Sequence, residues 1–236
     1  MENKIYHIDR DSVNDPYIIN EYIYKNLESN YYWSDDFSPE FYIELAYAGF
    51  ITVAIKEQGR FLLLPEMQFE YAVLDFEDLH ISKKVKKLLN KDNYTFSINK
   101  YFDKTIEQIN TYHEDSWLHD EYIELLKKLK NYKHKDIDFE LLSIELCDKD
   151  SGELIAAELG YKIAKTYTSL TGFFNREKKY NNYGKLQLTL LAKYLQSNNF
   201  SFWNLGHPYM DYKFDIGAKN YSRDYFLKKW KRSRLK

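Results

Sequence analysis

The chain has 236 residues, 44% of them apolar and 30% charged, with 34 Lys and Arg against 36 Asp and Glu. This length supports one large domain or two small ones, and the single cysteine, Cys147, excludes disulfide frameworks and Cys-rich zinc or iron–sulfur sites. Without an apolar run of 18 residues or a signal-peptide pattern, we expect a soluble cytoplasmic protein with no membrane partner and no bound metal. The oligomeric state has no signal in the sequence.

The N-terminal part of the chain predicts a small α/β unit. Ser38-Pro39-Glu40 combines a helix N-cap with a proline in the first turn, and Gly49 ends the apolar face that follows. Short apolar runs predict strands at 50–55, 61–64 and 69–74. The turn at 57–59 joins the first two runs as a hairpin.

Beyond this unit the pattern indicates a larger domain, so the predicted domains are 1–66 and 67–236. Apolar spacings of three and four predict helices at 82–89, 101–112, 119–129, 186–195 and 211–216. Alternating apolar runs predict strands at 139–146, 153–163, 165–174 and 200–205. Helices, a three-stranded meander, a helix and a strand in this order match the GNAT acyltransferase fold. The expected fold class is therefore α/β (α+β), with a small N-terminal domain and a GNAT-like second domain.

A set of short segments carries a further resemblance through its order and spacing. These segments are Asp36-Phe37-Ser38-Pro39, Leu79-His80-Ile81-Ser82, Ser116-Trp117-Leu118, Ser143-Ile144-Glu145, Glu153-Leu154-Ile155, Phe174-Asn175-Arg176, Ile216-Gly217-Ala218 and Arg223. Together they resemble the leucyl/phenylalanyl-tRNA–protein transferase family, whose members move an amino acid from a charged tRNA to a protein N-terminus. The resemblance implies aminoacyl-tRNA as a substrate, no cofactor, protein or peptide N-termini as acceptors, and a role in N-degron degradation.

Departures from the family bear on the amino acid that is transferred. Alignment through Glu153-Leu154-Ile155 puts Glu158 where the family has a methionine of its apolar aminoacyl pocket, and Thr171 where it has a glutamate. A buried unpaired carboxylate is costly, and an incoming guanidinium would pair with it. Arginine is therefore one expected substrate, with leucine or phenylalanine as the alternative, because strand alternation can also turn Glu158 to solvent. Phe173 and Trp117 complete the expected aminoacyl pocket.

The family's Asp-x-Gln segment is also changed, to Asn204-Leu205-Gly206-His207. Attack by an N-terminal amine on an activated ester needs a proton acceptor and an oxyanion donor, but no covalent nucleophile. His207 has a suitable reference pKa of about 6.5, and Asn204 aligns with the aspartate under one choice of gap. We expect both to be catalytic; a loop histidine bonded to backbone is the alternative interpretation of His207.

Basic and aromatic side chains predict the contacts to tRNA. Phosphates are met by cations, and unpaired bases stack on aromatic faces. The expected phosphate contacts are Lys83, Lys84, Lys86, Lys87, Arg176 and Lys185. Trp117 is the stacking candidate for the terminal adenine, with core filling as its alternative role. The basic run at 228–236 ranks second as a phosphate contact.

Two other functions stay open at this stage. A CoA-dependent N-acetyltransferase shares the fold, but its glycine-rich pyrophosphate motif is broken at Asn181 and Leu186. A degenerate family member would bind charged tRNA or a degron without transfer. Thr171 and the lost Asp-x-Gln favour that second alternative.

Overall fold

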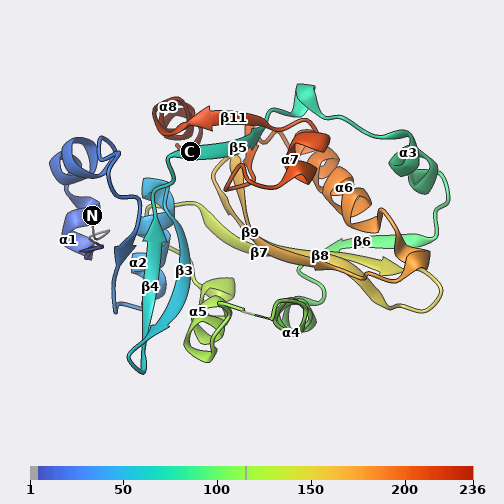
Figure 1. Cartoon of the computed structure of the whole chain (residues 1–236), viewed down its shortest axis with the longest axis horizontal. Helices are drawn as coiled ribbons and strands as arrows, with labels where there is room; N and C mark the ends of the chain where they lie inside the picture. The colour runs from blue at the N-terminus through green and yellow to red at the C-terminus, as the bar shows by residue number, and fades with distance from the viewer. Residues whose placement is uncertain (1–4, 115, 236) are drawn as a thin grey trace.

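The computed structural model describes residues 5–114 and 116–235, and a seven-stranded sheet forms its centre (Figure 1). Its strands are β5 (Glu70–Leu74), β6 (Tyr94–Ile98), β7 (Phe139–Asp148), β8 (Leu154–Ile163), β9 (Thr166–Phe174), β10 (Phe202–Asn204) and β11 (Lys219–Ser222). They lie in the order β11-β5-β10-β9-β8-β7-β6. The pair β9 and β10 is parallel, and the other neighbours are antiparallel. This mixed sheet confirms the predicted α/β class.

Two small sheets lie beside it. They consist of β1 (Tyr6–His7) with β2 (Tyr32–Trp33), and of the hairpin β3 (Ile51–Glu57) with β4 (Arg60–Glu66). The predicted hairpin is confirmed, with its turn at Gln58 and Gly59. The predicted strand at 69–74 exists as β5, but it pairs with β10 and β11 in the large sheet and not with the hairpin.

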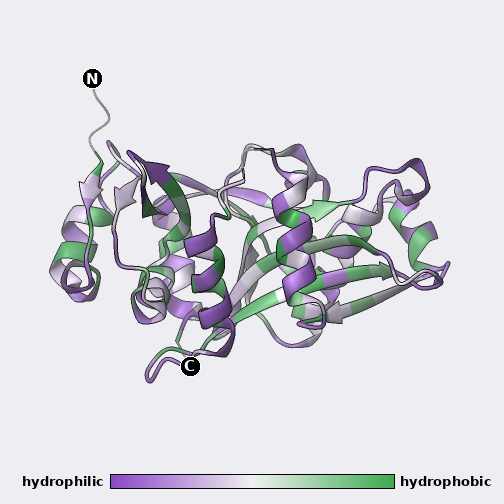
Figure 2. Cartoon of the chain, turned by 90° about the horizontal axis from the view of Figure 1, so that it is seen from below, coloured by the Kyte–Doolittle hydropathy of each residue, from purple (hydrophilic) through white to green (hydrophobic). Residues whose placement is uncertain are grey.

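Helices cover both faces of the large sheet. The helices are α1 (Arg10–Asn14), α2 (Pro39–Ala48), α3 (Lys83–Leu89), α4 (Phe102–Tyr112), α5 (Asp120–Asn131), α6 (Tyr183–Ser197), α7 (Asp211–Asp215) and α8 (Arg223–Ser233), with single π or 3-10 turns at Ile18–Ile23, Phe76–Asp78 and Lys178–Tyr180. Helices α6 and α7 lie on one face and α4 and α5 on the other (Figure 1). Figure 2 shows hydrophilic and hydrophobic residues alternating along the helices in the foreground, as expected where one side packs on a sheet. No helix in the described part of the chain is long and apolar enough to span a bilayer.

Helix α2 forms where the sequence predicts it, for the predicted reasons. The Ser38 hydroxyl accepts a hydrogen bond from the Phe41 amide at 3.3 Å, and Pro39 occupies the first turn. Gly49 ends the helix at φ 103°, a left-handed conformation that glycine adopts without a Cβ penalty. The helix thereby packs its buried face between the hairpin and α5.

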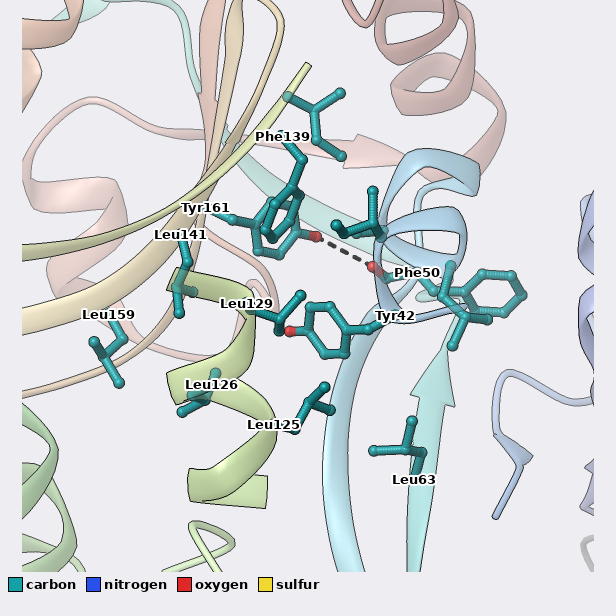
Figure 3. Packing of buried hydrophobic residues seen from close by; sticks show 14 of the residues in the cluster. Tyr42, Phe50, Leu63, Leu125, Leu126, Leu129, Phe139, Leu141, Leu159 and Tyr161 are labelled. Atoms are coloured by element: carbon teal, nitrogen blue, oxygen red, sulfur yellow. Dashed lines mark hydrogen bonds between the residues drawn. The ribbon is translucent and has the colours of Figure 1, made fainter. Parts of the chain in front are cut away.

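The largest hydrophobic cluster joins the hairpin, α2, α5 and the sheet (Figure 3). Buried tyrosines cross this region: the Tyr161 hydroxyl donates to the Phe50 carbonyl at 3.2 Å, and that of Tyr122 donates to the Thr52 carbonyl at 2.7 Å. Tyr42 lies 3.0 Å from the Tyr122 hydroxyl. One core therefore contains side chains from both sides of residue 66, the predicted domain boundary.

Candidate functional site

The C-terminal end of β10 is where the parallel pair separates. Asn204, the last residue of β10, is paired in register with Thr168 of β9 and is buried. Its Oδ1 accepts a hydrogen bond from the Gly206 amide at 3.0 Å, and Gly206 has φ 73°. Asn204 therefore shapes the turn that leads to His207.

His207 pairs with a carboxylate from the N-terminal hairpin. Its Nε2 lies 2.8 Å from Oε2 of Glu66, whose side chain is 6% exposed against 35% for His207. Glu66 also accepts from the Asn30 amide at 2.6 Å, and the Tyr209 ring stacks on His207 at 5.1 Å between centroids. Because Glu66 accepts the Nε2 proton, Nδ1 of neutral His207 is left as the proton acceptor. A histidine held in this way can act as a general base.

A buried lysine fixes the same turn from the other side. Nζ of Lys213, on α7, donates to the carbonyls of Leu205 and His207 at 2.6 Å each. Burial lowers the pKa of Lys213 to about 8, because the ammonium loses its hydration. These two bonds orient the backbone that presents the His207 ring.

Further along β9, the side chains of Thr171 and Phe173 face α4. Thr171 Oγ1 lies 3.5 Å from Nε2 of His113, which follows α4 and also lies 3.0 Å from the Gly172 carbonyl. Phe173 lines a cleft of about 420 Å³ between α4 and the end of β9. Arg176 lies in the same cleft, 4.4 Å above the Tyr112 ring. Two residues of the expected aminoacyl pocket thus lie on one face of β9.

Glu158 lies on the opposite face of the sheet, towards α6. Its Oε1 accepts hydrogen bonds from the Tyr167 hydroxyl and the Ser169 hydroxyl, both at 2.9 Å, and the residue is 5% exposed. Burial raises the pKa of Glu158 to about 7. A Cβ on Gly160 would lie 2.2 Å from the Tyr167 hydroxyl, so only glycine admits this bond. The solvent-facing alternative for Glu158 is wrong, and the sheet separates Glu158 from Thr171.

Trp117 lies between α4 and α5, on the same side of the sheet as Thr171. It is half-buried and its ring contacts that of Tyr122 at 5.0 Å, nearly at right angles. Trp117 therefore contributes packing to the α5 cluster and keeps part of its surface open to solvent.

The predicted phosphate contacts divide between two places. Lys83, Lys84 and Lys185 line a cleft of about 610 Å³ between α3, α7 and the start of α6, here called the lysine cleft. Lys185 pairs with Asp215 at 2.5 Å, whereas Lys83 and Lys84 form no ion pair within the described residues. Lys86 and Lys87 lie on α3 outside the lining of this cleft.

The C-terminal basic run is largely engaged within the fold. Lys228 pairs with Asp224 at 2.6 Å, Lys229 pairs with Asp75, and Lys231 donates to Asn20 at 2.7 Å. Among the described residues, Lys83 and Lys84 of α3 are therefore better placed to bind an external phosphate than these three lysines.

One acidic cluster offers the donors of a metal site. Oxygen and nitrogen atoms of Glu40, Glu44 and His134 lie within 4.8 Å of one another. The Arg10 guanidinium contacts both carboxylates, at 3.1 and 2.5 Å. His134 Nδ1 accepts two backbone N–H groups, so Nε2 holds the ring proton and has no lone pair for a cation. Arg10 thus takes the place that a cation would occupy.

Sequence reasoning identified His207 but not the groups that hold it. Glu66 ends a strand in an otherwise apolar stretch, which is a signal for a buried carboxylate. No feature of the sequence near Glu66 shows that its partner is His207. Lys213 lies in a mixed aromatic and polar segment whose burial appears only in the fold.

Two sequence comparisons with known proteins give the same family. The leucyl/phenylalanyl-tRNA protein transferase family matches residues 73–231. The chain is 27% identical over 159 residues to the leucyl/phenylalanyl-tRNA–protein transferase of Maridesulfovibrio salexigens, covering 66% of this chain and 61% of that relative. It is 24% identical over 160 residues to the corresponding protein of Flavobacterium psychrophilum, covering 66% and 70%.

The match therefore spans less than two thirds of the first relative's length. Among solved structures, a GCN5-related glucosamine N-acetyltransferase region of a fungal multi-domain β-N-acetylglucosaminidase is similar with a TM-score of 0.47 and 11% identity, covering 75% of this chain and 21% of that one. The matched segment begins after Glu66 and includes His207.

Proposed function

Because the chain belongs to the leucyl/phenylalanyl-tRNA–protein transferase family, we propose that it transfers an amino acid from aminoacyl-tRNA to the N-terminal amine of a protein. The observation that carries this proposal is the His207–Glu66 pair, at the point where β9 and β10 separate. It supplies a proton acceptor whose tautomer is fixed and whose ring is partly exposed to solvent.

The reaction needs a neutral amine at an activated ester. An N-terminal amine has a reference pKa of about 7.7–8.0, so an acceptor for its proton is useful near neutral pH. In the proposed step the amine nitrogen bonds to the ester carbonyl carbon while Nδ1 of His207 takes the amine proton. The bond from that carbon to the 3′ oxygen then breaks, and the proton passes to the oxygen that leaves. Glu66 stabilises the imidazolium between these two events.

The lysine cleft supports phosphate binding along the tRNA. Lys83 and Lys84 have no internal carboxylate partner in the described part of the chain, and Lys185 has one in Asp215. Cations of this kind supply affinity that does not depend on base sequence. We assign Lys86 and Lys87 a weaker role in the same contact, because they continue along α3.

The amino acid that is transferred has two candidates, each with its own support. Glu158, buried where the family has a methionine, supports arginine, whose guanidinium would pair with the carboxylate. The carboxylate already accepts two hydroxyl groups, so arginine would have to enter between α6 and the sheet. The substrates in the family's name support leucine or phenylalanine instead.

A competition experiment separates these candidates. The protein is incubated with Arg-tRNA, Leu-tRNA and Phe-tRNA together and a peptide acceptor, and the product is identified by mass. If the parent protein transfers Leu or Phe in preference, arginine is excluded as its substrate. If the parent transfers Arg and the Glu158→Met variant transfers Leu and Phe instead, arginine is supported.

The proposal as a whole is tested with a total charged tRNA pool and peptides bearing each N-terminal residue. Addition of one residue to the peptide, lost in His207→Ala, supports transfer. Binding of charged tRNA without any added residue would indicate the degenerate binding module, which Thr171 and Asn204 favour. We further propose that the products are N-degron substrates formed in the cytoplasm, where a conjugated reporter should be degraded faster than the unmodified one.

A further inference from the structure

The cleft between α4 and the end of β9, here called the Tyr112–Arg176 cleft, lies apart from the lysine cleft. Its volume of about 420 Å³ lies within the range of roughly 300–1,000 Å³ that is typical of small-molecule sites. Tyr112 closes one side, with its ring 6.3 Å from Phe173 and 5.7 Å from Phe174. Arg176 lies over the Tyr112 ring at 4.4 Å. Aromatic rings and one planar cation thus form part of the cleft lining.

Phe174 is placed to present its ring to a ligand. It is 46% exposed, unlike Phe173, which is 7% exposed. Helix α6 begins against the base of this side chain, because a Cβ on Gly184 would lie 3.2 Å from the Phe174 Cβ and 3.3 Å from its Cγ. An aromatic side chain whose Cβ is packed and whose ring is partly exposed can stack on the ring of a ligand.

The free charge of the cleft is positive. Arg176 and Lys104 line it and form no ion pair with any described residue. Its carboxylate, Glu153, accepts hydrogen bonds from the Asn175 amide and the Tyr180 hydroxyl, both at 2.9 Å. The carboxylate of Glu153 therefore has hydrogen-bond partners within the fold, and an anionic ligand in the cleft would meet Arg176 and Lys104, which have no carboxylate partner among the described residues.

The position of the cleft relates it to the proposed reaction site. Strand β9 carries an extra residue at Leu170, since Leu159 pairs with Thr171 and Gly160 with Ser169. This bulge places Thr168, which is paired with Asn204, on the same face of β9 as Phe173, and at about 3.3 Å per residue the two lie no more than about 16 Å apart. The terminal adenosine carries the reacting ester and must lie near His207. A cleft at this distance along the strand suits the nucleotide that precedes it.

We propose that the Tyr112–Arg176 cleft binds the unpaired base that precedes the terminal adenosine of aminoacyl-tRNA, an inference that rests on the proposed function. Unpaired RNA bases are held by stacking on aromatic side chains and on arginine planes, and their phosphates by cations. The cleft offers all three to one nucleotide. An acceptor peptide has a cationic N-terminus, which the charge of this cleft repels.

The test uses a short single-stranded RNA with the sequence of a tRNA 3′ end and 2-aminopurine at the penultimate position. Stacking quenches 2-aminopurine fluorescence, so titration reports both affinity and stacking at that base. We expect quenching with the parent protein, and affinity about ten-fold weaker with little quenching for Phe174→Leu. Arg176→Lys should lose quenching while keeping the salt dependence, because it retains the charge and removes the plane. Tyr17→Leu, at an exposed ring in the N-terminal part, is the matched control and should change neither.

Unchanged affinity and quenching in both cleft variants would overturn the inference, as would displacement of the RNA by an acceptor peptide. These results are separate from failure of the proposed function. Absence of transfer by the parent from every aminoacyl-tRNA would refute transfer, whereas an active parent with insensitive cleft variants would refute only the base site.

Discussion

Replacing Glu158 by glutamine should stabilise the protein at alkaline pH and not at acidic pH. The carboxyl group is buried, and its Oε1 accepts from the hydroxyl groups of both Tyr167 and Ser169, while Trp203 Nε1 donates to the Ser169 hydroxyl. Glutamine at position 158 retains an oxygen in that place, so Glu158→Gln keeps both hydroxyl hydrogen bonds and removes the ionisation.

The size of the effect follows from the pKa of the buried group. Burial raises the pKa of Glu158 from 4.5 to about 7. Between these values the folded chain holds a proton that the unfolded chain has released, so the free energy of unfolding falls as pH rises. At about 1.36 kcal/mol per pH unit, the loss is about 3 kcal/mol at pH 8 relative to pH 4.5. Glu158→Gln avoids this loss.

The assay compares thermal unfolding of the parent and Glu158→Gln at pH 5 and pH 8. For a chain of this size, about 1 kcal/mol corresponds to roughly 2–4 °C, so the variant should melt roughly 6–12 °C above the parent at pH 8. At pH 5 the two should differ little. Glu57→Gln, at an exposed position, controls for the change of net charge. Equal differences between parent and variant at both pH values would refute the reasoning.

Three further outcomes follow from the site. His207→Ala should lower kcat about 10²-fold or more with tRNA affinity unchanged, and Glu66→Gln should lower it less; full activity of His207→Ala would exclude a proton-acceptor role. Reversing the charges of Lys83 and Lys84 should weaken the binding of all tRNAs to the same extent and reduce the slope of log affinity against log salt by about 1.5. An unchanged slope would show that these two lysines do not contact the tRNA phosphates. The rate should fall above about pH 8, where Lys213 loses its proton, and Lys213→Arg should abolish that fall in a pH–rate profile.

Local signals predicted the elements whose causes are local. Helix α2 follows from Ser38, Pro39 and Gly49, and the meander β7 to β9 follows from long apolar runs separated by short turns. Strand β6 was missed because Tyr94–Ile98 is short and half-exposed, and β11 because Lys219–Ser222 is polar. Their pairing partners lie far along the chain, so the sheet and not the segment determines them.

The same limit applies to the site. His207 was visible as a lone histidine after a predicted strand, but its partner Glu66 comes from the other side of the core. Glu158 was visible as a departure from a family pattern. Only the register of β8 with β9 shows that Glu158 and Thr171 face opposite sides of the sheet.

The proposed chemistry depends on the junction between the hairpin and the large sheet. Glu66 is the last residue of β4, and His207 follows β10, so their bond crosses the predicted domain boundary. Arg223 strengthens the same junction, since its buried guanidinium donates to the carbonyls of Met67 and Gln68 and to those of Ile23 and Asn26. Because the family match begins at residue 73, the matched segment contains the proton acceptor without the carboxylate that orients it. The N-terminal part is therefore a component of the proposed active site, and the relative position of the two parts controls the reactive tautomer of His207.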